Sequence, residues 1–240
     1  MVKRINFIFL IGFPPVSLAL AQESSTPEPS QNEIVSATPT PVPISSPSPT
    51  PSAARAVSLK FVPPPMEGTV SLGIFDSNDK LVRVLHRQSS IDTFTIDENS
   101  LNTIWDGKND SGADSPPGKY RARGYLVAHF KVENLGSATA PTEASDHVAV
   151  KLVTNPLISD TRSVLDVATG FDAKGSFLKT MDGLPLFSLA EAPNLVRVVM
   201  TKAGDKSIDV WEDNGSVCQH VRVSNIDKMM AFDCGYFDLK

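Results

Sequence analysis

The chain has few cysteines, few aromatic residues and no long apolar run after its first segment. Of its 240 residues, 2 are cysteine and 7% are aromatic. A membrane-spanning helix needs about 20 mostly apolar residues, so we predict no stable membrane span once the first segment is removed. A basic excess is also missing, since the formal net charge is -5. Surfaces that neutralise phosphates need clustered Lys and Arg, so nucleic acid is not expected as a partner.

Sequence signatures of catalysis, cofactor binding and metal binding are missing as well. There is no Gly-x-Ser-x-Gly elbow, residues 204–207 lack the glycines of a phosphate-binding loop, and the four histidines lack zinc-ligand spacing. Carboxylates such as Asp166, Asp172 and Asp182 fall in predicted turns or at strand ends, where solvation and capping account for them. We therefore expect no catalytic residue, no cofactor and no metal, which is typical of a protein that is not an enzyme.

Residues 1–21 have the pattern of a signal peptide. Lys3 and Arg4 precede a short apolar run that is broken by prolines, and Ala19-Leu20-Ala21 supplies the small residues of a cleavage site. We predict cleavage before Gln22, and hence export to the periplasm or the extracellular space. The alternative is an uncleaved membrane anchor, which the shortness of the run disfavours.

Residues 22–53 are dominated by Pro, Ser and Thr, with repeated Thr-Pro and Ser-Pro steps. Such a segment cannot bury a core, because proline removes backbone donors and Ser and Thr offer little apolar area. We predict a disordered linker, partly in polyproline II conformation, that acts as a tether. A ligand for a proline-binding module and a site of O-glycosylation are the alternatives.

Short runs of alternating apolar residues begin after the tether and predict an all-β fold. Residues 54–135 contain an edge strand at 57–61, a hairpin of strands 70–74 and 81–85, and a last pair of strands within 119–132. No long helical period follows the signal peptide. We predict a small β-sandwich over 54–135.

Part of this region resembles the Ig-like domain of the flagellar hook-capping protein FlgD, a module found in many exported bacterial proteins. The similarity lies in residues 70–76, in residues 81–85, and in the motif of residues 105–112 that 117–120 follow. It implies an Ig-like sandwich that serves as an accessory or linking module, and it implies no chemistry. Hook capping itself is disfavoured, because hook caps of that family are not exported by a cleavable signal.

The motif is expected to be structural. A buried indole would need a partner for its N–H, glycines allow backbone angles forbidden to other residues, and Asp side chains close local turns. We expect a type II turn at Pro117-Gly118 that points Tyr120 inward and Arg121 outward. A calcium loop is the alternative, although the spacing of an EF-hand is not matched. The motif residues are Trp105, Asp106, Gly107, Asp110, Gly112, Pro117, Gly118 and Tyr120.

Residues 136–163 are predicted to be a connection that includes one strand, and 164–240 to be a smaller β-meander similar to a blade of a β-propeller. Strand candidates are 164–171, 195–200, 207–211 and 217–223. Asn214-Gly215 predicts a type I′ hairpin turn. Because a propeller needs at least four blades, the remaining length would make this segment a truncated propeller, with 226–235 as the first strand of a new repeat.

The two cysteines, Cys218 and Cys234, lie near the C-terminus. Export would place them where a disulfide persists, so a bridge between them is one prediction. The alternative is two small buried side chains.

The expected function is that of an exported, non-enzymatic binding or structural module of the cell envelope or extracellular space, with an envelope protein or a glycan as partner. One alternative is an accessory part or remnant of a secreted propeller-type enzyme. Another is a flagellar or surface assembly factor, which the resemblance suggests.

Overall fold

All regular structure in the described residues, 55–154, 156 and 164–240 of this computed structural model, is β-strand apart from one short 3-10 helix at Ile91–Thr93. The predicted all-β fold class is thus confirmed. The predicted signal peptide (1–21) and the tether (22–53) lie outside the described residues. Within the described part of the chain, no helix has the length and apolarity needed to cross a membrane.

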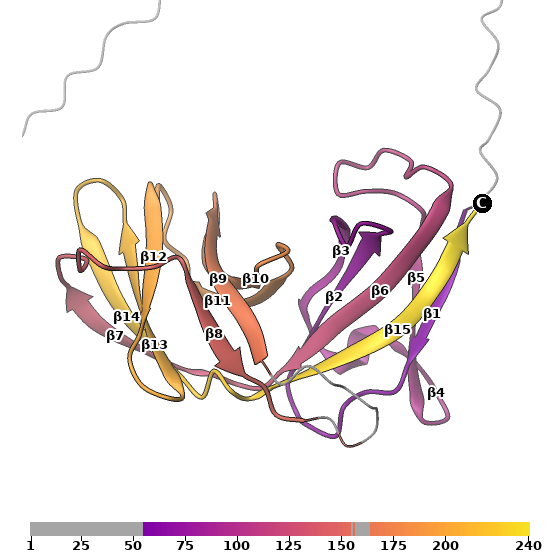
Figure 1. Ribbon diagram of the computed structural model, residues 1–240, viewed down its shortest axis with the longest axis horizontal. Coiled ribbons are helices and arrows are strands. Elements are labelled where there is room, and N and C mark those ends of the chain that lie inside the picture. The colour runs from indigo at the N-terminus through magenta and orange to yellow at the C-terminus, as the bar shows by residue number, and fades with distance from the viewer. Residues whose placement is uncertain (1–54, 155, 157–163) are drawn as a thin grey trace, which may run out of the picture. The chain divides into compact units, whose positions relative to one another are not determined.

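The strands of the described residues form four antiparallel sheets (Figure 1), with the orders β1-β5-β4, β15-β6-β2-β3, β11-β10-β9-β8 and β12-β13-β14-β7. In chain order the strands are β1 Val57–Phe61, β2 Thr69–Asp76, β3 Leu81–Ser89, β4 Thr95–Asp97, β5 Ser100–Trp105, β6 Gly118–Val127, β7 Lys131–Ser137, β8 His147–Lys151, β9 Val164–Asp172, β10 Gly175–Thr180, β11 Pro185–Ala190, β12 Arg197–Lys202, β13 Ser207–Asp213, β14 Cys218–Ser224 and β15 Met229–Leu239.

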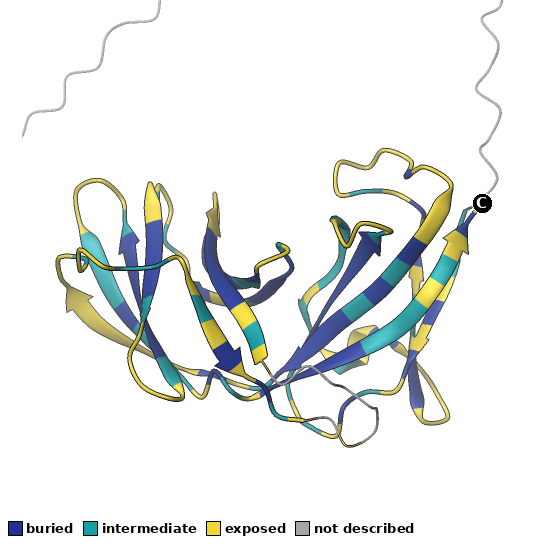
Figure 2. Cartoon of the chain, in the orientation of Figure 1, coloured by how far each residue is buried: buried dark blue, intermediate teal, exposed yellow. Residues whose placement is uncertain are grey.

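The sheets β1-β5-β4 and β15-β6-β2-β3 share one buried apolar cluster, and we call this pair the first sandwich. Alternation along β2 places Val70, Leu72 and Ile74 in that cluster. Phe61 of β1 stacks on Phe232 of β15, with ring centroids 4.3 Å apart. Figure 2 shows the resulting alternation of buried and less buried positions along β6.

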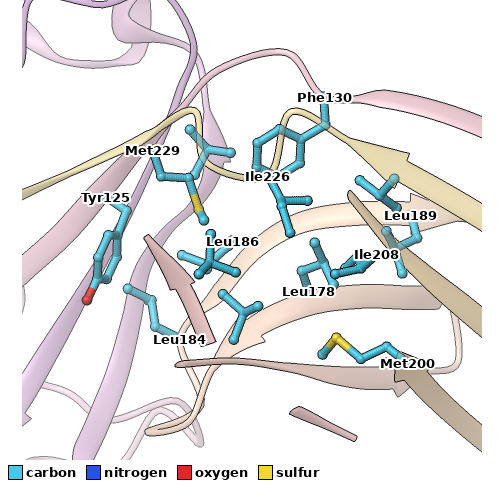
Figure 3. Close-up of a cluster of buried hydrophobic side chains, with 14 of the residues drawn as sticks. Tyr125, Phe130, Leu178, Leu184, Leu186, Leu189, Met200, Ile208, Ile226 and Met229 are labelled. Carbon is cyan, nitrogen blue, oxygen red and sulfur yellow. The ribbon is translucent and has the colours of Figure 1, made fainter. Parts of the chain in front are cut away.

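The sheets β11-β10-β9-β8 and β12-β13-β14-β7 form the second sandwich, around the cluster drawn in Figure 3. Leu178 and Met200 enter this cluster from the two facing sheets. The same cluster also contains Phe75 and Tyr125, which belong to the first sandwich. The two sandwiches therefore share apolar packing, and the described residues form one compact unit.

Two connections pass directly between the sandwiches. β6 of the first sandwich continues through residues 128–130 into β7 of the second, and β14 continues through 225–228 into β15, which returns to pair with β6. The Ala128 N–H donates to the Lys228 carbonyl oxygen at 3.0 Å, so the two connections lie side by side. Along the chain, β7 of the second sandwich thus follows β6 of the first, and β15 of the first follows β14 of the second.

This strand exchange crosses the boundaries predicted from the sequence. β7, which overlaps the end of the predicted first domain, pairs with β14, and residues 136–163 hold β8 as well as the end of β7. β15 begins in the segment predicted to start a new blade, yet it pairs with β6 over its whole length. The strands β10 and β11 were not among the predicted strands. The pairing partners are far apart in sequence, so no local pattern could reveal them.

The local predictions differ in outcome. The hairpin of strands 70–74 and 81–85 is confirmed as β2 and β3, which are antiparallel neighbours. The hairpin at Asn214-Gly215 is present, but its connection is 214–217 and only Gly215 has a positive φ, of 85°. The type I′ turn is therefore wrong. Asn214 instead accepts the N–H groups of Ser216 and Val217 on its side-chain oxygen, at 2.9 and 2.8 Å.

Candidate functional site

Trp105, the centre of the sequence motif, lies in the core of the first sandwich with no exposed surface. Its indole N–H donates to the carbonyl oxygen of Lys108 at 2.8 Å. The Tyr120 ring contacts it at 5.1 Å between centroids, and the Tyr120 hydroxyl donates to the Pro116 carbonyl at 2.7 Å. Both polar groups of the aromatic pair are satisfied by the adjacent loop.

The other motif residues shape that loop. Asp106 accepts the Lys108 N–H at 3.0 Å, and Asp110 accepts the N–H of Val84 in β3 at 2.9 Å. Gly107 and Gly112 have φ values of 76° and 82°, which residues with a Cβ rarely adopt. These contacts are internal to the fold.

The expected type II turn at Pro117-Gly118 is wrong. Such a turn needs a φ of about 80° at its third residue, whereas Gly118 has a φ of 157°. The reason is that β6 already begins at Gly118, which pairs with Leu239 of β15. The inward position of Tyr120 follows from the register of β6.

The predicted disulfide is not formed, since Cys218 and Cys234 are both free thiols. Cys218 opens β14 in the second sandwich, and Cys234 lies at an irregularity of β15 in the first. Burial raises the pKa of the Cys234 thiol to about 12. That thiol is therefore a poor nucleophile at neutral pH.

A polar pocket of about 720 Å³ lies where the two sandwiches meet, and we call it the junction pocket. The end of β3, the turn between β9 and β10, and the end of β11 with the residues after it supply its walls. The lining combines charges of both signs with hydroxyl groups and some apolar surface. It consists of Arg87, Asp172, Ala173, Lys174, Gly175, Ser176, Ser188, Leu189, Ala190, Glu191 and Pro193.

Arg87 reaches from the first sandwich to the second. Its guanidinium lies 3.1 Å from the carboxylate of Asp172 and 4.6 Å from the centroid of the Phe177 ring. The Lys174 backbone N–H, at 2.8 Å, and the Arg87 guanidinium hold the pKa of Asp172 below its usual value. The pocket lining thus includes an ion pair that presents both donors and acceptors.

The position of Arg87 depends on an unusual backbone conformation beside it. Gln88 has a φ of 50°, and its N–H donates to the hydroxyl oxygen of Ser71, a fully buried residue, at 3.2 Å. The Gln88 side-chain oxygen then accepts the Ser188 N–H of β11 at 2.9 Å. This bend at the end of β3 directs two successive side chains toward the second sandwich.

One residue of the pocket lining, Ser176, contacts a buried carboxylate that lies outside the lining. Ser176 and Glu212 are 2% and 3% exposed, and the Ser176 hydroxyl donates to the Glu212 carboxylate. A Cβ on neighbouring Gly175 would lie 2.1 Å from the Ala190 carbonyl oxygen, so the turn packs directly against β11. This contact holds Ser176 in place at the wall of the pocket.

A second ionic cluster, centred on the buried Asp209, lies in the second sandwich. The Arg222 guanidinium donates to both oxygens of Asp209, at 2.7 and 2.8 Å, and the His220 ring nitrogen lies 3.1 Å from Asp209. His220 also stacks on Trp211 with centroids 4.5 Å apart. The hydrogen bonds from Arg222 hold the pKa of Asp209 below its usual value. The cluster ties β13 to β14.

Replacing Asp209 by Asn is expected to lower the free energy of unfolding at neutral pH by about 1–2 kcal/mol. The expected loss is small because Arg222 is partly exposed, and solvent weakens its attraction to Asp209. A carboxyl whose pKa is lower in the folded state stabilises above its unfolded pKa, and that contribution is lost as the pH falls through the folded pKa. The deficit should therefore shrink below about pH 4. Urea unfolding of the unchanged protein and of Asp209→Asn between pH 7 and pH 3 measures this difference in stability. A deficit that stays constant down to the acid limit would contradict the assignment.

Sequence reasoning did not find the junction pocket. Asp172 was noted only as a carboxylate in a turn or at a strand end, explained by solvation and capping. Arg87 had no signal at all, because its role depends on a bend in β3 and on a strand some 85 residues further along the chain. Among the described residues, no group of three or more His, Cys, Asp or Glu side chains is placed to hold a metal ion.

No family model, no curated protein and no solved structure matches this chain. The resemblance of residues 70–125 to the Ig-like domain of FlgD stays a prediction.

Proposed function

We propose that this chain is an exported, non-enzymatic binding module of the cell envelope or the extracellular space, and that the junction pocket holds a polar group of an envelope protein or glycan. The observation that carries the proposal is the composition of the pocket. Its lining includes the Arg87–Asp172 ion pair, the charged residues Lys174 and Glu191, and Ser176, which the buried Glu212 carboxylate holds in place. Pockets that fix a ligand by a few convergent polar groups are the usual form of a binding site.

Preorganisation of the walls supports the same function. Arg87 is held by an ion pair and by the Phe177 ring, and Ser176 is held by a buried carboxylate. Side chains that are already ordered lose little entropy when a ligand binds. Lys174 and Glu191 add one charge of each sign to the lining.

The experiment is a binding assay with the mature full-length protein. Peptidoglycan, soluble envelope polysaccharides and purified envelope proteins of the producing cell are the probes, with cell fractionation to locate the protein. We expect one probe to bind, and Arg87→Ala and Lys174→Ala each to weaken that binding about tenfold, because each removes a charged donor from the pocket.

Lys60→Ala is the matched control, since Lys60 is an exposed lysine of β1 whose partner is Asp97. It should bind like the unchanged protein. The proposal is rejected if no probe binds, if the pocket variants bind unchanged, or if the protein stays in the cytosol with its leader intact.

A further inference from the structure

The outer face of the sheet β15-β6-β2-β3 carries one exposed aromatic side chain, Tyr236, with 61% of its surface exposed. Tyr236 lies on β15 directly opposite Arg121 of β6, so the two side chains share a face. Among the described residues of this sheet, no other large hydrophobic side chain is exposed. A single exposed aromatic ring is common on protein surfaces and by itself indicates no function. It indicates a binding site only where neighbouring side chains hold the ring in place.

Two cations hold the Tyr236 ring. The Arg121 guanidinium carbon lies 5.1 Å from the ring centroid, and the Lys119 amine nitrogen lies 5.6 Å from it. Such cation–π contacts favour one ring orientation. Arg121 is itself fixed, because its Nε donates to Asp233 at 2.9 Å and a second guanidinium nitrogen donates to the same carboxylate. The ring is therefore presented in a defined orientation.

Charges on this face are nearly balanced. The cations Lys119 and Arg121 are matched by Asp238, which lies opposite Lys119 in the strand register, and by Asp233, the ion-pair partner of Arg121. The face thus offers N–H donors and carboxylate acceptors without a net charge that would select an ionic ligand. Both kinds of group lie around the exposed ring.

We propose that Tyr236 with Lys119, Arg121 and Asp233 forms a second binding site, for a neutral saccharide unit of a glycan chain. A pyranose ring has an apolar C–H face that packs on an aromatic ring, and hydroxyl groups around its rim that both donate and accept. The site offers the complementary pair: an ordered ring, with donors and acceptors beside it. Tyrosine provides rigid contact area at low entropic cost.

A protein partner fits this face less well. A stable protein interface buries about 800 Å² on each side around an apolar centre. Here the one exposed aromatic side chain is bordered by charged groups that are already paired. The inference goes beyond the proposed function, because the site lies on the outer face of β15 and β6 and uses none of the residues of the junction pocket.

Affinity electrophoresis of the mature full-length protein tests the inference, with dextran, mannan and soluble β-glucan as neutral probes and polygalacturonate as the acidic probe. At least one neutral polysaccharide should retard the protein, equally at low and high salt. Tyr236→Ala should weaken that binding about tenfold, and Tyr236→Phe, which keeps the stacking surface, should stay within about twofold.

Two controls separate the alternatives. Ile104→Ala removes an exposed apolar side chain of β5, 66% exposed, and should bind normally. Lys60→Ala, the exposed lysine of β1 that belongs to neither site, should also bind these glycans normally. The junction pocket is assayed separately through Arg87→Ala and its own probe, so failure of the pocket and failure of this site are distinguishable. The inference is overturned if no neutral glycan binds, if binding is confined to the acidic probe and disappears at high salt, or if Tyr236→Ala binds like the unchanged protein. Urea unfolding of each variant verifies that it is folded.

Discussion

A fragment of residues 55–135, which ends where the sequence predicts the first domain to end, is expected not to fold cooperatively. It contains β1 to β6 but lacks β15, the neighbour of β6 along its whole length. Phe232 and Leu239 of β15 are buried in the core of the first sandwich. Each such side chain contributes about 1.5–3 kcal/mol by burial, a large part of the 5–15 kcal/mol that stabilises a typical domain.

Far-UV circular dichroism with increasing urea measures this. The fragment should show a broad, non-cooperative change, whereas the mature protein should show a steep transition. The missing strand would also leave the edge of β6 that faces β15 unpaired and open to association, so we expect aggregation at high concentration.

Restoring the strand is the control. Ala128 and Lys228 are joined by a backbone hydrogen bond of 3.0 Å, so a short Gly-containing turn between them can link residues 55–128 directly to 228–240. This shortened chain should fold, because both partners of the β6–β15 pair are present. A steep transition of the 55–135 fragment, at the midpoint of the mature protein, would refute the dependence on β15.

The second large effect is expected from Trp105→Ala. Trp105 is fully buried and contacts the rings of Tyr120 and Phe237 at 5.1 and 5.8 Å. Removing it deletes the largest buried side chain of the first sandwich and leaves a cavity that β-sheets cannot easily close. The expected loss is about 3–5 kcal/mol in the free energy of unfolding.

Ile104→Ala is the matched control for this substitution. Ile104 precedes Trp105 on β5 but points outward and is 66% exposed, so its loss should change stability by no more than about 0.5 kcal/mol. Equilibrium urea unfolding compares the two variants. Similar losses for both would show that the indole is not a principal element of the core.

Period-two alternation gives the strands a detectable sequence signal. The alternating apolar residues Val70, Leu72 and Ile74 predicted a strand, and the structure has it as β2, with its other face buried as well. Two strands that form one short hairpin gave weaker signals. β10 and β11 were missed for this reason, since their pattern lacks a regular polar face.

Turn chemistry was predicted only in part. Glycines at 107 and 112 do adopt positive φ angles. The turn types assigned to Asn214-Gly215 and Pro117-Gly118 were wrong, because a side-chain hydrogen bond shaped the first and strand pairing extended through the second. Local propensity yields to a competing interaction of about 1 kcal/mol, which either of these supplies.

By itself the sequence determined that the described residues fold as β-strands, which faces of many strands are apolar, and where an indole must be buried. Only the tertiary structure decided that β7 and β15 are exchanged between sandwiches, that the two cysteines lie in different sheets, and that Arg87 meets Asp172. The physical reason is that alternation acts between neighbouring residues, whereas strand partners and pockets depend on contacts between residues distant along the chain.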